Sequence, residues 1–212
     1  MLGGRMLALL LACSSGAATP GTGDKALAPV PQPAAGQQVA VLAGGCFWCL
    51  ESDMDKLPGV VATTSGFAAG RNDAPTYDQV GMGGTGHTEV VHVVFEPKVV
   101  SYEQVLDWFW KHHDPTDGRG QFCDRGDQYR PGIYPQDAAQ LAAAEASKKA
   151  LADSGALKAP IATEIVAGQK FWPAEVYHQD FYLKSSAHYL RYRIGCGRDA
   201  KVAEVWGSAP KH

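Results

Sequence analysis

The chain has 212 residues, of which 45% are hydrophobic and 19% are charged, and its formal net charge at neutral pH is −3. This length suits one domain with a substantial core. The slightly acidic balance argues against a nucleic-acid partner, and no apolar run is long enough to form a permanent transmembrane helix.

The first residues predict an export signal. Arg5 precedes the short apolar run Met6-Leu7-Ala8-Leu9-Leu10-Leu11-Ala12. A positive residue, a short apolar stretch and then a small residue are typical of a secretory signal peptide. We therefore expect residues 1–12 to be a signal that is removed on export.

The end of that run also resembles a bacterial lipobox. In Leu10-Leu11-Ala12-Cys13 the cysteine would be lipidated and become the first residue of the mature chain, and Ser14 suits sorting to an outer membrane. We therefore expect a periplasmic lipoprotein that is anchored to the outer membrane through Cys13. A soluble exported protein, cleaved near Ala17-Ala18, is the alternative.

A flexible tether is expected to follow the lipidated cysteine. Residues 14–37 are rich in Ser, Gly, Ala, Thr, Pro and Gln, a composition that buries too little apolar surface to fold. We assign 13–37 to the tether and 38–208 to a single folded domain.

Strands and helices alternate along the folded domain, and most are bounded by glycine, proline or a capping residue. Ser101 and Gln104 form a capping box for one helix, whereas Pro131 limits one strand to an edge or a bend. In chain order we expect a strand at 38–43, a helix at 46–57, strands at 60–67 and 88–95, a helix at 102–112, a strand at 128–134, a helix at 136–153, a strand at 161–166 and a helix at 174–182.

These elements predict an α+β fold. None of the strands has the long continuous apolar sequence of a fully buried parallel sheet. We expect a two-layer α/β sandwich with a mixed sheet, flanking helices and long irregular segments, including 114–127 and the chain after 182. A long loop in a compact domain is often functional.

A cysteine opens the first predicted helix. It lies in the run Gly44-Gly45-Cys46-Phe47-Trp48-Cys49, directly after the first strand. The positive end of the helix dipole and the unpaired backbone N–H groups there favour a reactive thiolate. The two aromatic side chains beside it predict an apolar pocket. A buried, inert cysteine in a tight turn is the alternative.

Four separated segments have unusually specific sequences. They are Gly45-Cys46-Phe47-Trp48, Gly86-His87-Thr88-Glu89-Val90-Val91, Asp124-Arg125-Gly126-Asp127-Gln128-Tyr129-Arg130 and Ala174-Glu175-Val176-Tyr177-His178-Gln179, and Val205-Trp206-Gly207 also fits. In this order they resemble the peptide methionine sulfoxide reductase A family, over about residues 39–207. The resemblance implies a sandwich of the ferredoxin-like type. It also implies reduction of the S epimer of methionine sulfoxide, free or in oxidised proteins, to methionine.

The resemblance further implies a role for individual side chains of one site. These are Cys46 as the nucleophile, Phe47 and Trp48 as the pocket for the substrate methyl group, Glu89 as the acid, Tyr77 and Tyr129 as the groups that bind the sulfoxide oxygen, and Asp124 as a further member of the site.

The chemistry of the reaction independently requires such residues. A thiolate attacks the sulfoxide sulfur while an acid protonates its oxygen. A carboxyl group does this near neutral pH only if burial raises its pKa, which fits Glu89 in its β-rich segment; a solvent-facing strand residue is the alternative. Phenol hydroxyls such as those of Tyr77 and Tyr129 can hydrogen-bond the oxygen, although both could instead be core aromatics. Cys46 becomes a sulfenic acid, which a second cysteine converts to a disulfide.

The sequence leaves that second, resolving cysteine open. Relatives often place it near the C-terminus, and Cys196 is our first choice because its flanking glycines would let a tail swing toward Cys46. Cys49, one helical turn from Cys46, is the second candidate, and Cys123, which adjoins Asp124, is the third. A structural bridge between Cys49 and Cys123 or between Cys123 and Cys196 is the alternative.

Two other functions fit parts of the sequence: a periplasmic thiol–disulfide oxidoreductase that uses the Cys46 and Cys49 pair, and an exported binding module with two structural disulfides.

The leading prediction requires methionine sulfoxide, an external thioredoxin-like dithiol and no bound cofactor. We expect no metal, because no Cys/His spacing joins His87, His178 and His188. We expect a monomer.

Overall fold

The structure is a computed structural model that describes residues 25–207. The expected signal at 1–12, the lipidation site Cys13, the tether up to residue 24 and the chain after 207 lie outside the described residues. No helix within 25–207 combines the length and the apolar character that a membrane span requires.

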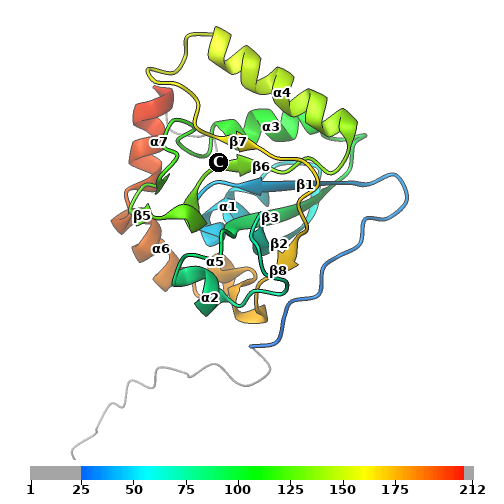
Figure 1. The fold of residues 1–212 in the computed structure, drawn as a ribbon, viewed down its shortest axis with the longest axis vertical. Helices are drawn as coiled ribbons and strands as arrows, with labels where there is room; N and C mark the ends of the chain where they lie inside the picture. Colours follow the sequence, from blue (N-terminus) through cyan, green and yellow to red (C-terminus); the bar gives the residue numbers. More distant parts are fainter. Residues whose placement is uncertain (1–24, 208–212) are drawn as a thin grey trace, which may run out of the picture.

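The described residues form a six-stranded mixed sheet (Figure 1). Its strands lie in the spatial order β7-β6-β1-β3-β2-β8, and only β6 and β7 are parallel. The bounds of these strands are β1 (Gln38–Ala43), β2 (Val60–Ala68), β3 (Thr88–Phe95), β6 (Gly132–Ile133), β7 (Glu164–Ile165) and β8 (Trp172–Pro173).

The remaining elements are helices and a short second sheet. The bounds of the α-helices are α1 (Phe47–Met54), α2 (Tyr77–Gly81), α3 (Tyr102–Trp110), α4 (Ala138–Asp153), α5 (Phe181–Lys184), α6 (Ser186–Gly195) and α7 (Arg198–Trp206). The second sheet is the hairpin of β4 (Gly120–Gln121) and β5 (Asp124–Arg125), and the 3₁₀ turns are η1 (Asp127–Tyr129) and η2 (Val176–His178).

The predicted α+β sandwich of the ferredoxin-like type is confirmed by the topology. Six elements follow each other along the chain in the order β1, α1, β2, β3, α3, β6, and their strands lie side by side as β6-β1-β3-β2 with every pair antiparallel. This is the split β-α-β arrangement of that fold. Strands β7 and β8 extend the sheet at its two edges.

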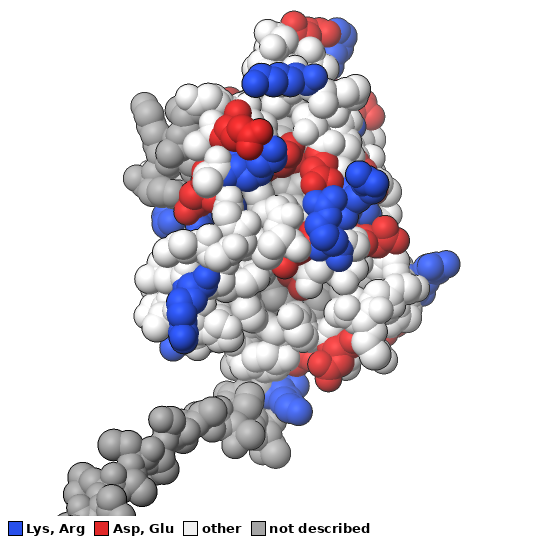
Figure 2. Space-filling model, turned by 90° about the vertical axis from the view of Figure 1, so that its left-hand side faces the viewer, with Lys and Arg blue, Asp and Glu red and all other residues white. Residues whose placement is uncertain are grey.

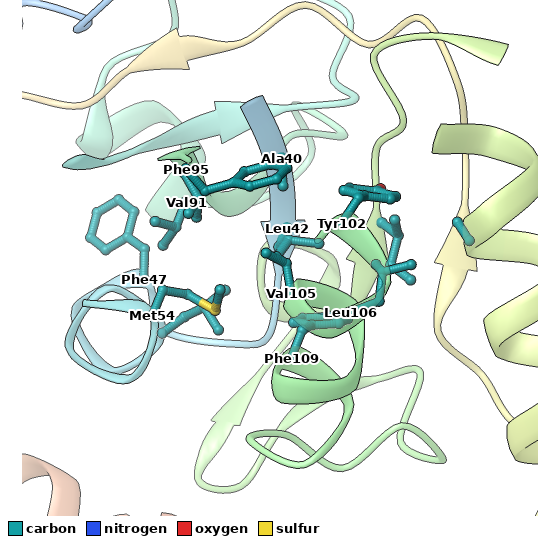
Figure 3. Packing of buried hydrophobic residues seen from close by; sticks show 14 of the residues in the cluster. Ala40, Leu42, Phe47, Met54, Val91, Phe95, Tyr102, Val105, Leu106 and Phe109 are labelled. Carbon is teal, nitrogen blue, oxygen red and sulfur yellow. The ribbon is translucent and has the colours of Figure 1, made fainter. Parts of the chain in front are cut away.

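Alternation along the strands divides the core between the two faces of the sheet. Helices α1 and α3 cover one face, where Leu42 of β1 and Val91 of β3 pack against Phe47 and Phe109 (Figure 3). The opposite face buries a smaller cluster, which consists of Val41, Ala43, Ala68, Val90 and Tyr134. The first turn of α1 therefore packs on the hydrophobic core between the sheet and the helices α1 and α3.

The short strands differ from the sequence expectation. The strand expected at 128–134 is reduced to two residues, and it lies inside the sheet between β7 and β1 rather than at an edge. Pro131 is compatible with this because it precedes the paired residues and its missing N–H is not needed there. The predicted capping box of Ser101 and Gln104 is confirmed, with both of its hydrogen bonds present.

The C-terminal region contradicts our expectation. The chain after 182, expected to be irregular, contains α6 and α7, and the helix expected at 174–182 is replaced by η2 and the single turn α5. Neither α6 nor α7 begins with a side-chain cap. Their buried residues include Arg193 and Arg198, so they lack the apolar stripe from which a helix is recognised.

Part of the expected tether packs against the domain. Leu27 forms a β-bridge with Glu175, the backbone N–H of Ala28 donates to Ala174 at 3.0 Å, and the Ala28 side chain is buried. Residues 27 and 28, within the segment that we expected to be a free tether, therefore contact the domain next to β8.

Charged side chains of both signs share the side of the molecule that carries α7, β5 and α6. On the described part of this face, Lys and Arg alternate with Asp and Glu, and neither sign forms an extended patch (Figure 2). The surface near these elements is therefore not a strongly charged docking face.

Candidate active site

A tight turn places Cys46 at the start of α1. Strand β1 ends at Ala43, and Cys46 is the residue that caps the helix. Gly45 has φ +84°, and a Cβ there would lie 2.5 Å from the Cβ of Gln121, so only glycine fits. In this turn Cys46 is buried, with 7% of its surface exposed.

Glu89 lies beside the start of the same helix. It belongs to β3, is 3% exposed, and its Oε2 accepts the backbone N–H of Phe47 at 2.9 Å. Burial raises the pKa of this carboxyl to about 8, although the Phe47 N–H favours the ionised form. At neutral pH the carboxyl is therefore mainly protonated and has a proton to give.

Aromatic rings surround the first turn of α1. Trp48 stacks on Phe181 with ring centroids 3.8 Å apart, and its Nε1 donates to Nδ1 of His178 at 3.0 Å. The His178 ring also contacts Phe47 and Tyr77, with centroid distances of 5.1 and 4.1 Å. Burial lowers the pKa of His178 to about 3, so a neutral ring accepts from the indole and orients Trp48.

Two phenols complete the aromatic wall. Tyr77 is the first residue of α2, which is fixed by the capping box of Thr76 and Gln79, and Tyr129 ends η1. Burial and then the charge of Glu89 raise the pKa of both tyrosines above the ordinary range. Both hydroxyls therefore remain neutral hydrogen-bond donors near Glu89. Helix α2 was not predicted from the sequence, although Thr76-x-x-Gln79 is a capping-box signature.

Asp124 enters the site from the β4–β5 hairpin. Its Oδ2 accepts a short hydrogen bond from the hydroxyl of Tyr192, which also interacts with the Cys46 sulfur. Burial raises the pKa of Asp124. Tyr192 was not predicted as a site residue, since it lies on α6, in the region that we expected to be irregular.

The four described cysteines divide into two pairs. Cys123 and Cys196 are joined by a disulfide, and Cys46 and Cys49 are free and buried. The bridge is one of the two structural pairings that the sequence left open. Within the described residues, one group of three side chains lies close enough to hold a metal ion, but two of its three members are these bonded sulfurs (the third is Asp124).

The charge of the free pair differs from the sequence expectation. Burial and then the hydrogen bond with Cys49 and the charge of that cysteine raise the pKa of Cys46, so the helix start does not make it a thiolate in the resting protein. The hydrogen bond from Cys46 and then the charges of Arg198 and Arg193 lower the pKa of Cys49, against the effect of burial. The surroundings of the pair therefore favour a negative charge on Cys49 over one on Cys46.

A family profile matches the whole folded domain. The profile described as "Peptide methionine sulfoxide reductase" covers residues 38–210. The chain belongs to this family. The turn that carries Cys46, strand β3 and the β4–β5 hairpin all lie within the matched range.

Curated members of the family are similar over most of this chain. "Peptide methionine sulfoxide reductase MsrA/MsrB" of Vibrio cholerae is 53% identical over 174 residues, which are 82% of this chain but 46% of the relative. The chain thus spans about half the length of that protein. "Peptide methionine sulfoxide reductase MsrA" of Bacillus subtilis is 46% identical over 172 residues, which are 81% of this chain and 97% of the relative.

Solved structures of the family share the fold. Mxr1 of Saccharomyces cerevisiae in reduced form superposes with a TM-score of 0.66 at 32% identity, over 72% of this chain and 87% of that chain. The same yeast protein in complex with Trx2 superposes with a TM-score of 0.51 at 23% identity, over 72% of this chain and 89% of that chain. The second similarity concerns the fold alone.

Proposed function

We propose that this protein reduces the S epimer of methionine sulfoxide, free or within proteins, to methionine by thiol chemistry. The observation that carries the proposal is a free cysteine, Cys46, beside a protonated buried carboxyl, Glu89, among aromatic side chains. Membership of the family supports the same reaction.

The first step transfers oxygen from the substrate to Cys46. The Cys46 sulfur attacks the sulfoxide sulfur, Glu89 donates its proton to the oxygen, and the Cys46 thiol proton passes to the Glu89 carboxylate. The hydroxyl group then moves to the Cys46 sulfur as the new sulfur–sulfur bond and the substrate sulfur–oxygen bond break, so methionine leaves and Cys46 becomes a sulfenic acid. The sulfoxide is reduced by two electrons and the cysteine is oxidised by two.

The groups around Cys46 select the epimer. In this proposal Phe47 and Trp48 contact the methyl group, and the hydroxyls of Tyr77 and Tyr129 donate to the oxygen. These contacts fix the directions of the methyl group and the oxygen, and Cys46 fixes the side from which the sulfur is attacked. Only one configuration of the sulfoxide meets all three.

The test of the function is an assay with resolved epimers. The protein is incubated with excess dithiothreitol and with the S or the R epimer of a methionine sulfoxide derivative, and methionine is quantified. We expect only the S epimer to be consumed. Equal consumption of both epimers, or of neither, would contradict the proposal.

Cys49 is the cysteine that we propose to resolve the sulfenic acid. Its thiol is hydrogen-bonded to that of Cys46, whereas our first choice from the sequence, Cys196, is bonded to Cys123. The Cys49 sulfur attacks the Cys46 sulfur, an S–S bond replaces the S–O bond, and water leaves. An external dithiol then reduces the new disulfide.

Two matched variants separate the candidates for the resolving cysteine. Cys49→Ser and Cys196→Ser should each release one equivalent of methionine, because Cys46 is intact in both. We expect Cys49→Ser to accumulate a sulfenic acid that dimedone traps, and to lose cycling with a thioredoxin. Cys196→Ser should keep cycling. The reverse pattern would assign the role to Cys196.

The electron donor in this proposal is a thioredoxin-like dithiol, and no bound cofactor is required. The reaction oxidises two thiols in each cycle, so any dithiol that can reach and reduce the Cys46–Cys49 disulfide completes the catalytic cycle. A complex of the yeast relative with Trx2 is consistent with such a partner.

Export and lipidation remain part of the proposal on the strength of the sequence alone. Arg5, the apolar run after it and Cys13 support a lipoprotein signal. Labelling of cells with radioactive palmitate should mark the full chain but not its Cys13→Ala variant. Equal labelling of both, or of neither, would exclude lipidation at this position.

A further inference from the structure

Two arginines lie directly beneath the turn that carries the free cysteines. Arg193 of α6 and Arg198 of α7 are 5% and 1% exposed, which is rare for this residue type. Arg198 donates from Nη1 to the carbonyl oxygen of Gly44 at 2.9 Å, and Nη1 of Arg193 lies 3.5 Å from the carbonyl oxygen of Cys49. The two guanidinium groups thus hold the backbone at both ends of the Gly44-to-Cys49 turn.

A single buried carboxylate lies between the arginines. Asp53 is fully buried on the last turn of α1, with Oδ1 2.8 Å from Nη1 of Arg193 and Oδ2 3.4 Å from Nε of Arg198. A second carboxylate, that of Asp199, lies 2.6 Å from Arg193 but is 46% exposed in its side chain, so solvent screens its charge. The buried part of the cluster therefore has two positive charges and one negative charge.

Stability alone is a weak reason for such a cluster. Desolvation of buried ions costs several kcal/mol per ion, and well-packed apolar side chains of similar volume often replace an ion pair without loss. What an apolar replacement would not reproduce is the positive charge of the two arginines, which acts on the Cys49 sulfur.

We propose that Arg193 and Arg198 are positioning residues that act on the reaction through Cys49. They hold the turn between Gly44 and Cys49, and they stabilise a negative charge on the Cys49 sulfur. The inference rests on the proposed function for its role in turnover, because Cys49 is there the nucleophile that attacks the Cys46 sulfenic acid.

Charged or titratable groups from several elements bear on Cys49. These groups are Cys46 at the N-terminus of α1, Asp53 on α1, Glu89 on β3, Tyr189 and Arg193 on α6, and Arg198 on α7. Asp53 and burial disfavour a charge on Cys49, whereas the hydrogen bond from Cys46 and the two arginines favour it, and the net effect lowers the pKa of Cys49.

A thiolate at Cys49 assists two steps. In the resolving step it attacks the Cys46 sulfur, the S–S bond forms as the S–O bond breaks, and the leaving hydroxide takes a proton from solvent to become water. When the external dithiol attacks the Cys46 sulfur of the disulfide, the Cys49 sulfur leaves, and a thiol with a lower pKa leaves faster.

The test measures the titration of Cys49 without any sulfoxide. In full-length protein with Cys46→Ser, Cys49 is the remaining free cysteine of the described residues, and its thiolate is followed by absorbance near 240 nm against pH. Arg198→Met and Arg193→Met should each raise its pKa by about 1 unit or more, because each removes an opposite charge from its vicinity. Arg191→Met is the matched control, since Arg191 lies on the same helix α6 and is exposed.

Arg198→Lys separates charge from shape. It keeps the positive charge but not the paired donation to Gly44 and His112, so we expect a smaller rise of the Cys49 pKa than in Arg198→Met. In protein that keeps Cys46, Arg198→Met should slow the loss of the Cys46 sulfenic acid, and Arg198→Lys should recover part of that rate. Circular dichroism identifies variants that fail to fold, and Arg193→Met and Arg198→Lys keep the test open if Arg198→Met is one of them. An unchanged Cys49 titration in folded variants would overturn the proposal, whatever the assay of the two epimers shows.

Discussion

Cys46→Ser is expected to release no methionine above the uncatalysed background, with or without dithiol. A serine hydroxyl at neutral pH is a far weaker nucleophile than a cysteine sulfur and cannot form a sulfenic acid. The decisive measurement is a single turnover, in which stoichiometric enzyme is mixed with the S epimer and methionine is counted per protein molecule. Wild-type protein should yield at least one equivalent.

This variant is a clean test because the fold should tolerate it. Cys46 caps α1 without a side-chain hydrogen bond to the helix, and serine is a favoured residue at that position. We therefore expect an unchanged or slightly higher melting temperature. If folded Cys46→Ser released one equivalent of methionine, the nucleophile would have to be another group, and the proposed chemistry would be wrong.

Glu89→Gln is expected to slow the release of methionine about 10²- to 10⁴-fold, the usual contribution of a positioned general acid. Glutamine keeps the size of the side chain and an oxygen that accepts the Phe47 N–H, but it has no proton to give. The rate of the methionine burst in a single turnover measures this step directly. An unchanged burst rate would remove Glu89 from the role of acid.

The pH profile provides an independent readout of the same group. Because burial raises the pKa of Glu89 to about 8, the carboxyl is protonated below that pH, and the wild-type burst rate should fall as pH rises through about 8. The Glu89→Gln variant should lack this decline.

The stability of the same variant follows the same shift. A folded-state pKa above the unfolded value means that the folded protein binds the proton more tightly, so Glu89 destabilises the fold increasingly as pH rises from about 4.5 toward 8. Glutamine removes this penalty, and loss of folding cannot be the reason for its low rate. A melting temperature at pH 8 well below that of the wild type would contradict this account.

The central fold could be predicted because its residues follow the period of their elements. The strand ending at Phe95 is rich in β-branched residues, and Ser101 with Gln104 signals the start of α3. The structure brings Cys46, Glu89 and the two tyrosines near one another, as the resemblance implied. The short connection from β1 to α1 places Cys46, and the pairing of β3 with β1 places Glu89, whereas the tyrosines come from α2 and η1.

The C-terminal part of the site could not be predicted for physical reasons. Helices α6 and α7 bury tyrosine and arginine side chains whose partners are backbone carbonyls and a carboxylate far away in the sequence. Such contacts leave no periodic apolar pattern, so Tyr192, Arg193 and Arg198 were missed together. The disulfide between Cys123 and Cys196 was likewise only one of several possible pairings, because the spacing of cysteines in a sequence does not specify which of them are bonded.

The bridge between Cys123 and Cys196 has a consequence for any measurement of turnover. It joins residues 73 positions apart. Closing a loop of that length lowers the chain entropy of the unfolded state, which stabilises the folded state by about 4 kcal/mol at 25 °C. The β4–β5 hairpin and the junction of α6 with α7 are the segments it connects. A strong dithiol that regenerates the catalytic thiols also attacks this bond, so the reagent that sustains the reaction lowers the resistance of the same molecules to heat and denaturant.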